Sequence, residues 1–147
     1  MKIKLDKIVY PELKEYLLSQ DGITYVDINY DGYYIEVNVK YNKKTNLILV
    51  MKYIELFQNY KSSCLVEFDK EYEESTKTLK YIIKDMCCEH CYNALVMNLF
   101  ENNKVKSVKS NFDIEKGFFN IEFIIEYIKD YKEQDLIKYI KEKCSCQ

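Results

Sequence analysis

The sequence predicts an α+β fold built from two similar units that follow one another along the chain. Two observations indicate it: an internal repeat, and the alternation of strand-like and helix-like apolar patterns within each copy. The 147 residues are enough for two small units. A hydrophobic content of 48% allows a packed core and argues against disorder.

The repeat becomes visible when Val9 is placed against Cys91 and the two copies are read on without gaps. The positions that then agree are apolar in both copies: Leu17 with Leu99, Ile23 with Val105, Val26 with Val108 and, after a four-residue insertion in the second copy, Ile54 with Ile140. We therefore predict units at 1–70 and 77–147, joined by the acidic linker 71–76.

The first unit is expected to alternate strands and helices in the order βαββαβ. The predicted elements are a strand at Ile3–Leu5, a helix at Pro11–Ser19, strands at Ile23–Tyr30 and Tyr33–Tyr41, a helix at Leu47–Phe57 and a strand at Cys64–Phe68. This order is the split β-α-β pattern of the ferredoxin-like sandwich. Helices would cover one face of an antiparallel sheet.

The second unit is expected to repeat this order with its last strand very short or missing. Its predicted elements are a strand at Leu79–Ile83, a helix from Cys91 to Asn102, strands at Val105–Phe112 and Phe118–Ile125, and a helix marked by Leu136, Ile137 and Ile140. The strand Leu79–Ile83 is then a poorly covered edge, which we expect to pair with the other unit or with another chain.

The composition disfavours nucleic acid and membranes as partners. The formal net charge is -2, and all 22 basic residues are lysines, whereas phosphate and base recognition usually rely on arginine. No apolar run approaches the ~18 residues that would span a membrane, and no apolar signal region follows the N-terminus. A cytoplasmic location with reduced cysteines is therefore expected.

A cysteine cluster lies just before a predicted helix, in the run Met86-Cys87-Cys88-Glu89-His90-Cys91. In a reducing compartment, such clustering points to metal or redox chemistry more than to disulfides. Cys88 and Cys91 can place two sulfurs on one side of the loop, close enough to share an ion. The helix N-terminus stabilises thiolates, and paired thiolates select Cu(I) or another thiophilic ion over hard cations.

The pattern Met86-x-Cys88-x-x-Cys91, between the first strand and first helix of such a unit, resembles the heavy-metal-associated domain. That family includes small copper chaperones, the N-terminal modules of copper-transporting ATPases and mercury-binding proteins. The resemblance covers Lys77 to about Lys143. It implies Cu(I) bound by Cys88 and Cys91, with Met86 pointing into the core and shaping the loop. It also implies a metal-transporting ATPase or another metal acceptor as partner.

The first unit resembles the same fold more weakly. It carries Asp6 and Val9 at the positions of the two ligands, so we do not expect it to bind metal in this way. It would be a degenerate copy used for packing, partner docking or dimerisation.

Two features depart from the family pattern. Cys87 precedes the first ligand, and Cys144 and Cys146 follow the last helix, whose exit returns toward the end of the first strand in this topology. If these cysteines joined Cys88 and Cys91, the site could close around Zn(II) or a small Cu(I) cluster. Binding would then favour storage or sensing over quick transfer.

Other interpretations are less favoured by the sequence. A thioredoxin-like redox pair would need a nearby cis-proline, and the single proline, Pro11, lies far upstream. Cys64 alternates with apolar residues and is expected in the core, while His90 is expected to be an exposed bystander. No paired carboxylates, nucleophile–base set or phosphate loop predicts an enzyme.

The sequence thus predicts a soft-metal binding protein, most simply for Cu(I), that serves metal trafficking, buffering or resistance. Zn(II) or another thiophilic ion remains open, as does a homodimer. The alternative is a metal- or redox-responsive protein-interaction module without metal transfer.

Overall fold

The computed structural model describes residues 1–5, 12–31, 34–58, 65–72, 74–86, 88–112 and 119–144. The first unit contains β1 (Lys2–Leu5), α1 (Leu13–Leu18), β2 (Ile23–Asp31), β3 (Tyr34–Tyr41), α2 (Leu47–Gln58) and β4 (Leu65–Asp69). The second contains β5 (Thr76–Asp85), α3 (Glu89–Glu101), β6 (Val105–Ser110), β7 (Phe119–Ile128) and α4 (Glu133–Lys143). Both element orders are those predicted from the sequence.

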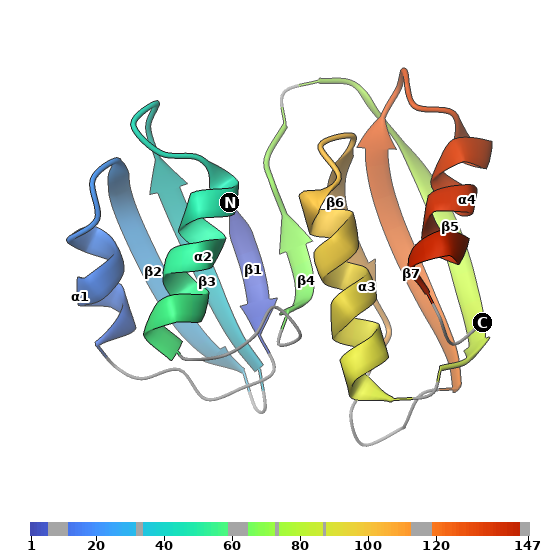
Figure 1. The fold of residues 1–147 in the computed structure, drawn as a ribbon, viewed down its shortest axis with the longest axis horizontal. Helices are drawn as coiled ribbons and strands as arrows, with labels where there is room; N and C mark the ends of the chain where they lie inside the picture. The colour runs from blue at the N-terminus through green and yellow to red at the C-terminus, as the bar shows by residue number, and fades with distance from the viewer. Residues whose placement is uncertain are drawn as a thin grey trace.

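The strands of the described residues form one seven-stranded antiparallel sheet in the order β2-β3-β1-β4-β6-β7-β5. Helices α1 to α4 cover one face of this sheet (Figure 1). In the first unit β4 pairs with β1, which completes the ferredoxin-like arrangement. In the second unit no described strand follows α4. The predicted fold, two tandem ferredoxin-like units with antiparallel strands, is confirmed for the described residues, and the predicted very short or missing last strand of the second unit would fall at residues outside them.

The two units join through β4 and β6. Phe68 faces Val108 in this short antiparallel pair, and the amide of Lys70 donates to the carbonyl of Lys106 at 2.9 Å. The first unit therefore meets the second at β6, at the side away from the predicted edge strand. Among the described residues, the first unit therefore does not pair with the edge strand, contrary to one of the two expectations, and pairing with another chain stays a prediction.

Strand β5 is longer than the sequence analysis predicted. It runs from Thr76 to Asp85 instead of Leu79–Ile83, because the alternating Thr and Lys residues at its ends continue the pairing with β7. It begins at the last residue of the predicted linker 71–76, and the division of the chain at that linker stays a prediction. No helix in the described part of the chain is long and apolar enough to cross a membrane.

The core behind the cysteine loop is aromatic. Tyr92, in the first turn of α3, stacks on Phe112 with ring centroids 4.2 Å apart and on Phe123 at 5.5 Å. At the other end of α3, Phe100 meets Phe68 of β4 edge to face at 5.2 Å. Offset and edge-to-face contacts of this kind are the favoured geometries of aromatic pairs. They fix α3, and with it the first turn that carries Cys91, against the sheet.

Candidate metal site

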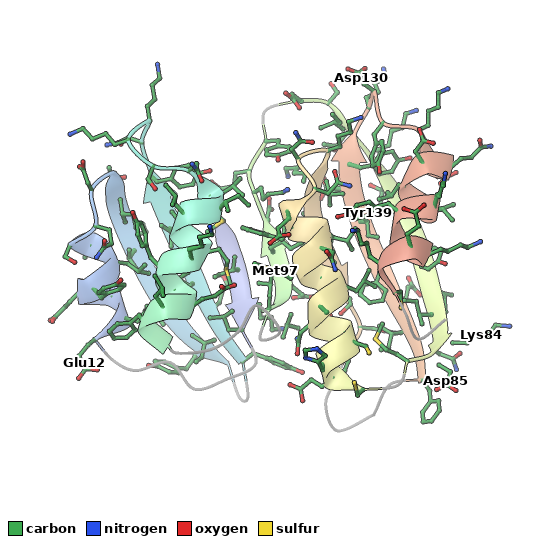
Figure 2. The ribbon with its side chains drawn as sticks, in the orientation of Figure 1. Glu12, Lys84, Asp85, Met97, Asp130 and Tyr139 are labelled. Carbon is green, nitrogen blue, oxygen red and sulfur yellow. The ribbon has the colours of Figure 1, made fainter. Side chains whose placement is uncertain are left out.

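The chain reaches the site at the end of β5. Asp85 is the last residue of that strand (Figure 2), and Met86 then enters the core with 2% of its surface exposed. Cys88 has extended backbone angles (φ -170°, ψ 167°) and is the N-cap of α3, which begins at Glu89. A change from extended to helical backbone at an N-cap is the usual start of a helix. Cys91 therefore lies in the first turn, on the side where the N–H groups have no helical acceptor.

The structure brings Cys88 and Cys91 together. Both cysteines are partly exposed and neither is in a disulfide, and their sulfur atoms are 3.6 Å apart. With a metal–sulfur bond of about 2.3 Å, two ligands of a tetrahedral ion would be separated by about 3.8 Å, and two opposite ligands of a linear ion by about 4.6 Å. The pair thus fits a tetrahedral or trigonal ion directly. A linear ion requires the side chains to open by about 1 Å.

The surroundings of Cys88 favour its thiolate. The backbone N–H of Cys91 is the main cause that lowers the pKa of the Cys88 thiol, and the Cys91 thiol and the N–H of His90 add to it. Partial burial and the Glu89 carboxylate oppose this effect without reversing it. Both N–H groups belong to the first turn of α3, whose partial positive charge also favours a thiolate. The deprotonated form that a metal requires is favoured.

The remaining predicted ligands do not gather around this pair in the described part of the chain. Cys144 is 4% exposed and is the C-cap of α4, and no group of three or more His, Cys, Asp or Glu side chains forms among the described residues. Cys87 and Cys146 lie outside the described residues, as does Cys64. His90 is exposed in the first turn of α3.

Two buried polar groups that the sequence analysis overlooked tie the site helix to the first unit. The Tyr92 hydroxyl donates to the carbonyl of Val66 at 3.0 Å, and the Asn93 side-chain amide donates to the carbonyl of Leu65 at 2.8 Å. Asn93 is 2% exposed. The available signal was its position three residues before Val96, on the apolar face of the predicted helix.

Lys70 holds the other end of the same helix. Its ammonium donates to the carbonyls of Phe100 and Asn102, both at 2.8 Å, where the C-terminal end of α3 attracts a cation. The side chain is 4% exposed, and burial lowers its pKa from 10.5 to about 7. The signal in the sequence was that Lys70 continues the buried alternation of Val66 and Phe68.

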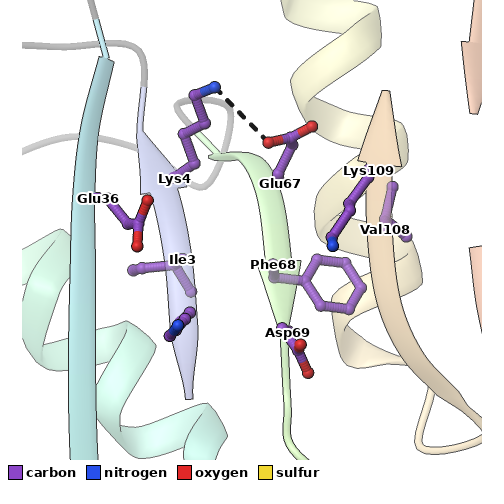
Figure 3. A pocket seen from close by; sticks show the side chains of 9 residues that line it. Ile3, Lys4, Glu36, Glu67, Phe68, Asp69, Val108 and Lys109 are labelled. Atoms are coloured by element: carbon purple, nitrogen blue, oxygen red, sulfur yellow. Dashed lines mark ion pairs between the residues drawn. The ribbon is translucent and has the colours of Figure 1, made fainter. Parts of the chain in front are cut away.

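A hollow of about 270 Å³ lies where β1, β4 and β6 meet (Figure 3). Its charged lining balances three lysines against three carboxylates: Lys2, Lys4 and Lys109, with Glu36, Glu67 and Asp69. Lys4 and Glu67 already form an ion pair at 3.6 Å. No cysteine or histidine is among its lining residues, so the thiol pair remains the site with distinctive chemistry.

Comparison with known proteins does not assign a function to this site. No family model matches the chain, and no curated protein matches it. A solution structure of the N-terminal soluble domains of Bacillus subtilis CopA aligns with 97% of this chain and 88% of that one, at 17% identity and a TM-score of 0.37. Similarity at this level supports no conclusion about the fold or the function of this chain. The fold therefore rests on the topology described above.

Proposed function

We propose that this chain binds a thiophilic metal ion, Cu(I) in the first place, through the thiolates of Cys88 and Cys91. The observation that carries the proposal is the pair of partly exposed thiols 3.6 Å apart at the N-terminus of α3. Two soft sulfur donors favour Cu(I) or Zn(II) over hard cations. The helix N-terminus offsets part of the negative charge that two thiolates bring together.

The metal is cargo in this proposal, and no catalytic step is involved. A site with two partly exposed ligands leaves coordination positions of the ion open to a partner. Thiolates of an acceptor, for example a metal-transporting ATPase, can then replace Cys88 and Cys91 one at a time. This exchange suits trafficking or buffering in a reducing compartment such as the cytoplasm, where the thiols stay reduced.

Whether the ion is handed on or retained depends on further ligands. Cys87, Cys144 and Cys146 are the candidates within this chain, and with them the site would close. Cys144 would first have to leave its buried position at the end of α4. We therefore propose transfer or buffering of the metal ion before storage.

A second function, redox response without metal transfer, is favoured by the same short distance. Sulfur atoms 3.6 Å apart need to approach to about 2.05 Å to form a disulfide, a small movement for two side chains at a helix start. The lowered pKa of Cys88 would assist attack on an oxidant. Oxidation would remove both metal ligands at once.

A competition titration tests the metal proposal. Reduced protein is titrated with Cu(I), and separately with Zn(II), in the presence of a chelator of known affinity. We expect tight binding that is lost in Cys88→Ser/Cys91→Ser and kept in Cys144→Ser, a matched control at a thiol outside the pair. Equal binding by the wild type and the double variant would refute the proposal.

Equilibrating the protein with glutathione buffers of known potential, and measuring whether Cys88 and Cys91 form a disulfide, distinguishes the redox function from the metal function. A Cys88–Cys91 disulfide that forms at a potential near that of the cytosolic glutathione pool would favour redox response. A dithiol that stays reduced under those buffers, together with tight Cu(I) binding, would favour the metal function.

A further inference from the structure

Strand β5 is the outermost strand of the sheet among the described residues. Within the described part of the chain it has one neighbour, β7, with which it pairs without a register shift. The strand has ten residues and no proline. In the first unit the equivalent place beside β1 is filled by the antiparallel strand β4. Long, regular edges of this kind are usually shortened, bulged or covered in proteins.

The side chains of β5 are divided between the two faces of the sheet. Leu79 and Ile83 are buried under the helices, whereas Lys80, Ile82 and Lys84 lie on the opposite face, with Ile82 56% exposed. A strand that extended the sheet would therefore need apolar residues opposite Leu79 and Ile83. On the other face it must not place a cation opposite Lys80.

We propose that the occupant of this edge is β5 of a second copy of this chain, paired antiparallel about a two-fold axis at Tyr81. When two identical antiparallel strands pair about a two-fold axis, the numbers of any two residues that face each other add up to the same value. Opposite residues lie on the same face of the sheet. With Tyr81 at the axis, Leu79 faces Ile83 of the second copy, so both apolar rows continue under the helices.

The charges of the strand select this register. With Tyr81 at the axis, Lys77 faces Asp85 of the second copy, and the symmetry makes this pair twice. On the solvent face Lys80 lies opposite Ile82, and Lys84 opposite Thr78. No lysine faces another lysine.

The neighbouring registers that keep the same faces are disfavoured. An axis at Lys80 places Lys80 directly opposite its own copy, and an axis at Ile82 places Lys80 opposite Lys84 twice. Like charges directly opposite each other in a sheet are destabilising. The lysines of this edge therefore permit pairing of the strand with itself about Tyr81 and disfavour the two registers next to it.

The pairing keeps the two cysteine loops apart. Asp85, at the end of β5 (Figure 2), faces Lys77 of the second copy, eight residues from the second Asp85. At about 3.3 Å per residue, the two strand ends that lead into the loops are about 26 Å apart. Two copies paired in this way cannot share one ion, so the dimer is independent of the proposed metal function.

Charge exchange at the ends of β5 tests the pairing. The dissociation constant of the dimer is measured by sedimentation velocity in the Cys88→Ser/Cys91→Ser background, with reductant and chelator, so that metal bridging does not contribute. Lys77→Asp and Asp85→Lys each replace two attractive pairs by two repulsive ones. Each is expected to weaken the dimer about tenfold, and the double exchange is expected to restore it.

Lys141→Asp, on the exposed side of α4, controls for the change in net charge and should leave the dimer unaffected. Two results would overturn the proposal. One is a chain that stays monomeric at every accessible concentration. The other is a dimer whose dissociation constant does not respond to the single exchanges, or is not restored by the double one. Neither result bears on Cu(I) binding, which is measured separately.

Discussion

Titration of Lys70 should make the free energy of unfolding of the wild-type chain rise with pH above neutrality, and replacing Lys70 by methionine should remove this contribution. Lys70 is buried between the two units, with its ammonium against the carbonyls of Phe100 and Asn102. Methionine has nearly the same length and fills the same apolar surroundings without a charge. The comparison therefore isolates the ionisation of one amine.

The size of the effect follows from the pKa of Lys70. Burial lowers it from 10.5 to about 7 in the folded protein. Between these two values the unfolded chain binds more protons than the folded one, so the free energy of unfolding increases as the pH rises. The contribution is fully present above pH 10.5 and is lost as the pH falls toward 7. The whole difference between the two pKa values corresponds to at most about 5 kcal/mol.

The assay is urea unfolding of both proteins at several values between about pH 6 and pH 9. The stability of the wild type minus that of Lys70→Met should be constant below pH 7 and should then rise by up to about 1.4 kcal/mol per pH unit. Subtraction removes the titration of groups common to both chains. Lys141→Met, at an exposed lysine, controls for loss of a surface charge. If the difference in free energy of unfolding between wild type and Lys70→Met stays constant or falls with pH, the pKa of Lys70 is not lowered by burial.

Two further predictions concern the site helix. Asn93→Leu leaves the carbonyl of Leu65 without its buried donor and should lower the free energy of unfolding by about 1–3 kcal/mol. The control Asn98→Ala removes a hydrogen bond within α3 itself and should lower the free energy of unfolding less. An equal loss in the two variants would contradict the role of Asn93 in joining α3 to β4. Cys88 should be alkylated by iodoacetamide at a lower pH and faster than the buried Cys144, because its pKa is lowered and its thiol is partly exposed. Peptide mass spectrometry after short exposure measures both thiols, and earlier labelling of Cys144 would count against the description of the site.

Much of the fold could be predicted because the apolar periodicity reports the burial of each element. Helix α2 begins at Leu47, as predicted, and strand β6 begins at Val105, as predicted. The length of β5 could not be obtained in the same way. The residues beyond the predicted bounds include Thr76, Lys77 and Asp85, which carry no apolar signal and pair with β7. The periodicity of apolar side chains does not report how far the backbone pairing of a strand extends.

The cysteine pair could be found from sequence because its chemistry is local. Cys88 and Cys91 are three residues apart at a helix start, and one turn of backbone brings them together. The contacts that fix this helix were missed because they join residues about 30 positions apart, such as Asn93 and Leu65. No short window of sequence contains both partners. Only the pairing of β4 with β6 places them side by side.

These contacts show how closely the two units depend on each other. Leu65 and Val66, at the start of β4, accept hydrogen bonds from the first turn of α3, and Lys70, just after β4, binds its last turn. Five residues of extended strand span about 16 Å, and the nine helical residues between Asn93 and Asn102 span about 14 Å, so the two elements match in length. The first unit thus supplies the surface along which the thiol-bearing helix lies. Both ends of α3 are hydrogen-bonded to β4 or to the residue just after it, so loss of packing between the units would leave the first turn held by the stacking of Tyr92 on Phe112 and Phe123. The first unit thus contributes hydrogen bonds that help to place the first turn of α3 in the second.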